Sequence, residues 1–164
     1  MKDYKAIEDY LKTGIRPEPG ADLNDLTLVH TIEEIQKLYE LVDSDDPFKE
    51  DVLVRWVQLC DTTEKARLSY YLAPDDNKAR PTLLSRWVQL CVTHTEAKKW
   101  FKESPKGTKT NAAFLIRWDQ LSLVALRSVT TVEQAKALFD ESPDEKGCRS
   151  RGAIRAKITD LWPE

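Results

Sequence analysis

A six-residue motif recurs along this chain at a constant interval of 31 residues. Arg-Trp-Val-Gln-Leu-Cys begins at Arg55 and again at Arg86, and Arg-Trp-Asp-Gln-Leu-Ser begins at Arg117. A fixed interval of this size is typical of stacked repeat proteins, in which each repeat is one supersecondary unit that buries its apolar face against its neighbours. The interval therefore restricts the fold more than any other feature of the sequence.

The first half of each repeat begins at a threonine, and these are Thr31, Thr62, Thr93 and Thr131. Threonine is a favoured N-cap because its hydroxyl accepts a hydrogen bond from a free N–H of the first helical turn. Three residues further on stand Glu34, Lys65, Glu96 and Gln134. Glutamate and glutamine there complete a capping box, whereas lysine does not. We therefore expect the helix after Thr62 to begin less firmly than the other three.

The same helices share a pattern on one face and a common end. A small or aliphatic residue is followed four positions later by an aromatic ring, as at Ala97 and Phe101. Residues four apart lie on the same face, so a neighbouring helix can approach the small residue and pack beside the ring. A proline at 74, 105 and 143 then predicts the helix end. The first repeat has Asp43 at that place, so its helix is expected to continue slightly further.

The second half of each repeat predicts an amphipathic helix. It begins near the N-cap residue types Asp46, Asn77 and Thr108, and Pro81 is expected to delay the start of its helix. An apolar stripe then repeats as Leu53, Trp56, Leu59, Cys60; as Leu84, Trp87, Leu90, Cys91; and as Leu115, Trp118, Leu121, Ser122. Exposed tryptophans could stack on bases or peptides. Their place inside a periodic apolar stripe favours the core.

These patterns predict an all-α protein: a right-handed α-solenoid of stacked antiparallel helix pairs. The expected organisation is one domain over 1–164, with an N-terminal cap at 1–30 that includes a helix over 3–13, followed by repeats at 31–60, 61–91, 92–129 and 130–164. The last repeat is degraded and has Ala156 where a tryptophan is expected. Terminal repeats are often atypical because one of their faces meets solvent.

The pattern resembles tandem helical-hairpin repeats of uncharacterised bacterial proteins. The residues that carry the resemblance are Ala97-x3-Phe101-x2-Ser104-Pro105 and the Leu-x-Arg-Trp-x-Gln-Leu run that contains Trp118. The resemblance covers residues 31–161. Trp87-x2-Leu90 also loosely resembles the start of a tetratricopeptide helix, although that repeat has a period of about 34 residues. The resemblance implies helical hairpins and implies neither an activity nor site residues.

Composition excludes several classes of protein. With 32% charged and 41% hydrophobic residues, the chain suits a soluble globular protein, which we expect to be cytoplasmic and not to contact a membrane. Its three cysteines lack the spacing of a zinc ribbon or a disulfide framework. Cys91-x2-His94 has metal-like spacing but no second pair to complete a site. Neither His30 nor His94 accompanies a nucleophile motif, so we expect no enzyme activity, metal or cofactor.

Candidate partner-binding residues come from the distribution of charge. Residues 1–61 carry a net charge of −8 and residues 62–164 a net charge of +5. The arginines of the repeated motif, Arg55, Arg86 and Arg117, could bind acidic groups, or could pair internally with a carboxylate or a ring. Two basic clusters supply further candidates: Lys98, Lys99 and Lys102, and Arg149 with Arg151.

Two functions follow as hypotheses. The first is a non-enzymatic module that binds a protein or peptide, as a monomer or a weak head-to-tail oligomer. The alternative is a nucleic-acid-binding repeat protein that uses the basic C-terminal half, since basic stripes on helical repeats can follow a phosphate backbone.

Overall fold

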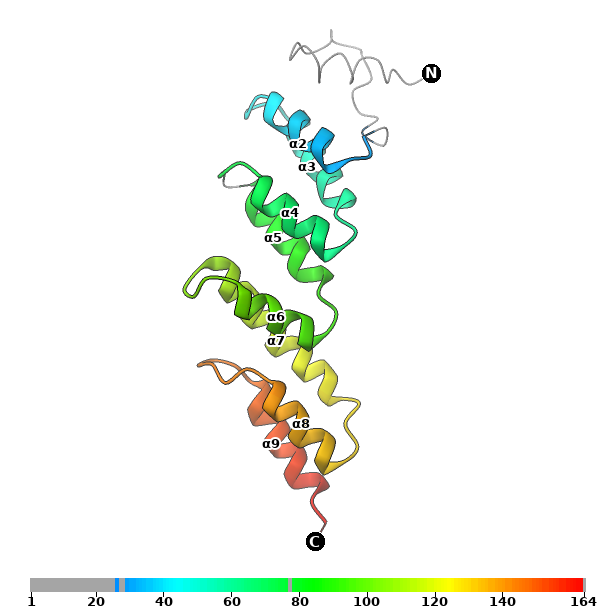
Figure 1. Ribbon diagram of the computed structural model, residues 1–164, viewed down its shortest axis with the longest axis vertical. Coiled ribbons are helices and arrows are strands. Elements are labelled where there is room, and N and C mark those ends of the chain that lie inside the picture. Colours follow the sequence, from blue (N-terminus) through cyan, green and yellow to red (C-terminus); the bar gives the residue numbers. More distant parts are fainter. Residues whose placement is uncertain (1–25, 27–28, 77, 164) are drawn as a thin grey trace. The chain divides into compact units, whose positions relative to one another are not determined.

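The structure is a computed structural model that describes residue 26 and residues 29–76 and 78–163. The described residues form helices and no strands, so the all-α prediction is confirmed. The helices are α2 (Ile32–Leu41), α3 (Phe48–Leu59), α4 (Thr63–Leu72), α5 (Ala79–Leu90), α6 (His94–Glu103), α7 (Lys109–Leu126), α8 (Val132–Glu141) and α9 (Ser150–Leu161) (Figure 1). The helix expected over 3–13 lies outside the described residues.

The helices pack as sequential pairs that coincide with the repeats. Helix α2 packs against α3, α6 against α7 and α8 against α9, and α4 meets α5 where the rings of Tyr70 and Trp87 lie 5.9 Å apart. The chain divides into two compact units, residues 1–87 and residues 88–164. In the first unit α2 also contacts α4, and in the second α7 contacts both α8 and α9.

All four predicted threonine caps are confirmed. Each hydroxyl accepts from the backbone N–H three residues later at 3.2 Å, and the caps are Thr31, Thr62, Thr93 and Thr131. Among the described helices the full capping box closes on α8, where the Gln134 side chain also accepts from the Thr131 N–H. The cap bond on α4 has the same length as the others, so it forms without a box partner; the weaker start expected for this helix stays a prediction.

The ends of the first helices follow the proline prediction with one correction. Helices α4, α6 and α8 end two residues before Pro74, Pro105 and Pro143. Helix α2 has the same length as these three, ten residues, so it does not continue further, contrary to the sequence prediction. It ends because Val42 is buried in an extended conformation, and its carbonyl accepts from Lys49 Nζ at 3.0 Å.

The second helices begin where side chains accept their first N–H groups. The Asp46 carboxylate accepts from Phe48 N at 3.0 Å, and Thr108 caps α7. Asn77 lies outside the described residues, and Asp76 accepts from the N–H groups of residues 78 and 79 at 2.9 and 2.6 Å. Helix α5 begins at Ala79, so Pro81 does not delay it. Proline is tolerated there because the first N–H groups of a helix have no intrahelical acceptor.

The repeated tryptophans lie in the core, as predicted. Trp56, Trp87 and Trp118 are at most 6% exposed. Each meets the aromatic ring of the preceding helix, with centroids separated by 5.6 Å to Tyr39, 5.9 Å to Tyr70 and 5.4 Å to Phe101. An aromatic pair at equivalent positions therefore joins the two helices in each of these three repeats.

Two core positions differ from the predicted stripe. Val52, Leu83 and Phe114 are fully buried four residues before each tryptophan, whereas the predicted stripe began three residues before it. In the first helices a further position is buried between the small residue and the ring, and it holds Leu38, Ser69, Trp100 and Leu138. Its residue type varies so widely that no repeat is visible in the sequence.

The last repeat departs from the predicted alignment. Ala156 is exposed and does not replace a tryptophan, because the loop after α8 is longer than its counterparts. The buried face of α9 runs through Ser150 and Ile154, and Ile158 packs against the same core. Asp119, which replaces a valine in the third copy of the motif, accepts from Ser150 N at 2.9 Å and so caps α9. Helix α7 is extended to 18 residues.

Candidate functional site

The arginines of the repeated motif form identical internal clamps. Nε of Arg55, Arg86 and Arg117 donates to the carbonyl oxygen 26 residues earlier, at 3.2, 2.9 and 3.0 Å. These acceptors are Val29, Cys60 and Cys91, which are themselves 31 residues apart.

Cys60 and Cys91 directly follow α3 and α5, where helical carbonyls lack intrahelical donors and cations are favoured. The internal acceptor shared by all three arginines in the described residues is thus a backbone carbonyl, whereas the sequence suggested a carboxylate or a ring. Contact of these arginines with a partner stays a prediction.

Two of the three candidate lysines on α6 have partners within the second unit. Lys98 Nζ lies 2.8 Å from the Glu141 carboxylate, and Lys99 Nζ lies 4.5 Å from the centre of the Trp100 ring. Lys102 is exposed. Lysines 98, 99 and 102 share α6, but at Lys98 an acidic side chain interrupts the positive surface.

Arg149 and Arg151 lie at the start of α9. Arg149 is exposed. Arg151 donates to the Ser142 carbonyl at 3.1 Å, lies 3.3 Å from the Asp144 carboxylate and stacks over the Phe139 ring at 4.6 Å. Arg155 lies over the same ring at 5.2 Å. In this repeat guanidinium groups cover the aromatic ring that a tryptophan contacts in the other three.

The two repeat cysteines are packing residues. Cys60 and Cys91 are fully buried, as is Ser122 at the equivalent position of the third repeat. Burial raises the pKa of both thiols, that of Cys91 to about 12. They are therefore protonated at neutral pH, which makes them poor nucleophiles and poor metal ligands. Within the described ranges, no group of three or more His, Cys, Asp or Glu side chains is placed to hold a metal ion.

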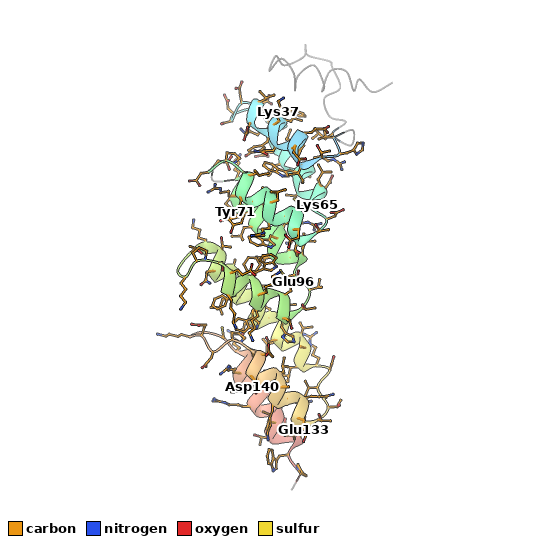
Figure 2. All side chains as sticks on the ribbon, in the orientation of Figure 1. Lys37, Lys65, Tyr71, Glu96, Glu133 and Asp140 are labelled. Atoms are coloured by element: carbon orange, nitrogen blue, oxygen red, sulfur yellow. The ribbon has the colours of Figure 1, made fainter. Side chains whose placement is uncertain are left out.

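Helix α4 carries an exposed apolar surface that the repeat pattern did not predict. Leu68 is 47% exposed, Tyr71 is 56% exposed and Leu72 is 37% exposed, and Figure 2 shows Tyr71 on this helix. Residues at i, i+3 and i+4 share one face of a helix, so the three side chains form one surface, which we call the α4 apolar face. Arg67 lies over the Tyr71 ring at 5.9 Å and borders this face.

In α2, α6 and α8, the positions equivalent to Leu68 and Tyr71 are mostly polar. They hold Lys37 and Glu40 in α2, Lys99 and Lys102 in α6, and Ala137 and Asp140 in α8. The fold therefore does not require large apolar side chains there. An alignment of the four helices on their threonine caps contains this difference, but a repeat is recognised by the residues that its copies share and not by those that one copy lacks.

A cavity lies beside the C-terminal end of α4, within the first unit. Its volume is about 560 Å3, and its walls come from the loops that follow α2 and α4 and from the start of α3. Tyr39 Oη donates to Asp76 Oδ2 at 2.7 Å on one wall. Burial of Tyr39 and its bond to the Asp76 carboxylate raise the pKa of the phenol well above its usual range.

Comparison with known proteins finds no matching family model, no matching curated protein and no matching solved structure. The candidate site consequently stands on the geometry of this chain. No helix of the described part is both long and apolar enough to cross a bilayer.

Proposed function

We propose that this protein is a non-enzymatic interaction module that binds a segment of a protein partner on the α4 apolar face. The observation that supports it is the exposure of Leu68 and Tyr71 at positions where the other first helices carry mainly charged side chains. Exposed apolar surface costs solvation free energy, and a contiguous patch of it commonly marks an interaction site. An aromatic ring flanked by leucines is also the residue chemistry that concentrates binding energy in interfaces.

The α4 apolar face suits a helical or extended segment that inserts a few aliphatic or aromatic side chains. Short segments of this kind bind helical surfaces through anchors spaced by three or four residues. The ring of Tyr71 is held in place on two sides, since it lies 5.3 Å from the Tyr70 ring and 6.2 Å from the Trp87 ring. A fixed ring loses little conformational entropy when a partner packs on it.

Affinity capture from a lysate of the source cells tests this proposal. The bait is the full chain, compared with a variant in which the α4 apolar face is made charged: Leu68→Lys, Tyr71→Lys and Leu72→Glu. We expect a defined protein to bind the wild type and to be lost from the variant. Circular dichroism checks that the variant remains helical, and Leu68→Lys alone is the milder second variant.

The matched control changes α6 without touching α4. Lys99→Leu with Lys102→Tyr should leave capture of the partner unchanged. A partner retained by the α4 variant would contradict the proposal. Capture of nucleic acid that is removed by nuclease and by about 0.2 M salt would instead favour the alternative function.

We further propose that the helix pairs stack in succession as a right-handed α-solenoid. The support is the constant 31-residue interval together with the arginine clamps, each of which ties a second helix to the end of the preceding repeat. Small-angle X-ray scattering tests this, because a solenoid predicts an elongated particle and a compact bundle of the same length contradicts it.

A further inference from the structure

The C-terminal ends of α2 and α4 carry an acidic border beside the α4 apolar face. Gln36 Nε2 donates to the Leu72 carbonyl at 3.2 Å and to Glu40 Oε1 at 3.3 Å. One amide group therefore holds the Glu40 carboxylate next to the last residue of the α4 apolar face. Asp75 follows three residues later; its side chain is 90% exposed, and one of its oxygens lies 3.5 Å from the Arg80 guanidinium.

The cavity at the same end adds further negative charge. Four carboxylates and two ammonium groups line it, and they are Asp45, Asp46, Glu50, Asp76, Lys49 and Lys78. Both ammonium groups have partners inside the unit. Lys49 Nζ donates to the Val42 carbonyl and lies 4.5 Å from the centre of the Tyr39 ring, and Lys78 pairs with Glu50 at 3.0 Å. The lining is therefore acidic on balance.

Arg80 of α5 offsets part of the charge of Asp75, with which it pairs at 3.5 Å, whereas the cations of α4 itself have partners away from this border. Lys65 lies 2.7 Å from the Asp61 carboxylate. Arg67 lies 3.8 Å from Glu64 and stacks over Tyr71. Both belong to the N-terminal part of the helix and have acidic neighbours there, whereas Glu40, Asp75 and the cavity lie toward its C-terminal end.

We infer that the segment that covers the α4 apolar face is basic and amphipathic. Its aliphatic or aromatic side chains pack on Leu68, Tyr71 and Leu72, and its lysines or arginines lie along Glu40, Asp75 and the mouth of the cavity. Complementary charge orients a segment and speeds its association more than it adds affinity. This inference rests on the proposed function, because it names the chemistry of the partner.

Two designed peptides test the inference on the full chain. Both have about 18 residues, roughly five helical turns, and the same leucine positions. One carries lysine at all the remaining positions, and the other carries glutamate there. Fluorescence anisotropy measures their dissociation constants. We expect the lysine peptide to bind the wild type and the Leu68→Lys, Tyr71→Lys, Leu72→Glu variant to lose that binding.

A second variant isolates the acidic border. Glu40→Gln, Asp45→Asn and Asp75→Asn remove three charges and leave the α4 apolar face intact. We expect the lysine peptide to bind this variant about five- to ten-fold more weakly, as loss of a few exposed charge pairs would produce. Glu133→Gln, Asp140→Asn and Glu145→Gln in the second unit remove the same number of charges, and these changes should leave binding unchanged.

Three results would overturn the inference. One is equal or tighter binding of the glutamate peptide that depends on the α4 apolar face, which would refute a basic partner while leaving the proposed function intact. In the second, the lysine peptide binds the α4 variant as well as it binds the wild type. In the third, the lysine peptide does not bind the wild type. The proposed function fails separately, if lysate capture does not depend on Leu68 and Tyr71.

Discussion

Helices α4 and α6 occupy equivalent places in successive repeats and differ where they meet solvent. Both have ten residues, a threonine cap and a fully buried alanine, which is Ala66 in α4 and Ala97 in α6. Their exposed positions hold Leu68 and Tyr71 in one and Lys99 and Lys102 in the other. The buried face is restricted by packing, so it repeats. Packing does not restrict the exposed face, so its side chains can differ between repeats. A partner can therefore distinguish one repeat from another by these exposed side chains.

Truncation of a buried tryptophan should have the largest effect on stability. Trp87→Ala removes a side chain that is 2% exposed and leaves a cavity beside Tyr70. We expect the free energy of unfolding to fall by about 3–5 kcal/mol in urea denaturation. Trp162→Ala, at a 55% exposed position, should cost less than about 0.5 kcal/mol. Similar losses in the two variants would show that the tryptophan stripe is not the core.

Removal of one arginine clamp should have the next largest effect. Arg117→Met leaves the Cys91 carbonyl without the two donors that it now has at 3.0 and 2.8 Å. We expect a loss of about 1–3 kcal/mol in the free energy of unfolding. Arg117→Lys keeps the charge and loses the planar pair of donors, so it should recover only part of the loss. Full recovery by lysine would mean that charge alone matters at this position.

The Tyr39–Asp76 pair should make stability depend on pH. Burial opposes ionisation of Asp76, but hydrogen bonds from Tyr39 and from backbone N–H groups, with the charge of Lys49, outweigh it and lower the pKa of Asp76. A lowered carboxyl pKa contributes stability above the unfolded pKa, and this contribution is lost as the pH falls through the folded pKa.

We expect Asp76→Asn to cost about 1 kcal/mol at pH 7 and to approach the wild type below about pH 4. Asparagine can still cap α5, so the change tests the charge and not the cap. Urea titrations at several pH values measure the difference. A gap between the two proteins that does not change with pH would contradict this role, and Asp75→Asn serves as the exposed control.

Exchange of the exposed faces should have the smallest effect on stability. We expect Leu68→Lys with Tyr71→Lys in α4, and Lys99→Leu with Lys102→Tyr in α6, to change the free energy of unfolding by less than about 1 kcal/mol each. Thermal denaturation followed by circular dichroism measures both. A much larger loss in α4 alone would show that its apolar face supports the fold and is not reserved for a partner.

The sequence by itself determined the helix pairs, their threonine caps, their proline ends and the burial of Trp56, Trp87 and Trp118. Those features are local or periodic, so the spacing of residue types along the chain is enough to reveal them. The register of α9 was not predicted, since it depends on the length of the preceding loop and on the cap that Asp119 supplies from α7.

Only the tertiary structure decided which side chains share a surface. It placed Arg117 against the carbonyl of Cys91 and Gln36 between Leu72 and Glu40, so that Arg117 contacts a residue 26 positions away and Gln36 one 36 positions away. It also showed that Leu68 and Tyr71 are exposed on α4, a helix that has the same repeat pattern in the sequence as the other first helices. Apolar residues at helical spacing predict burial, and whether another helix covers them depends on packing between elements that no local pattern contains.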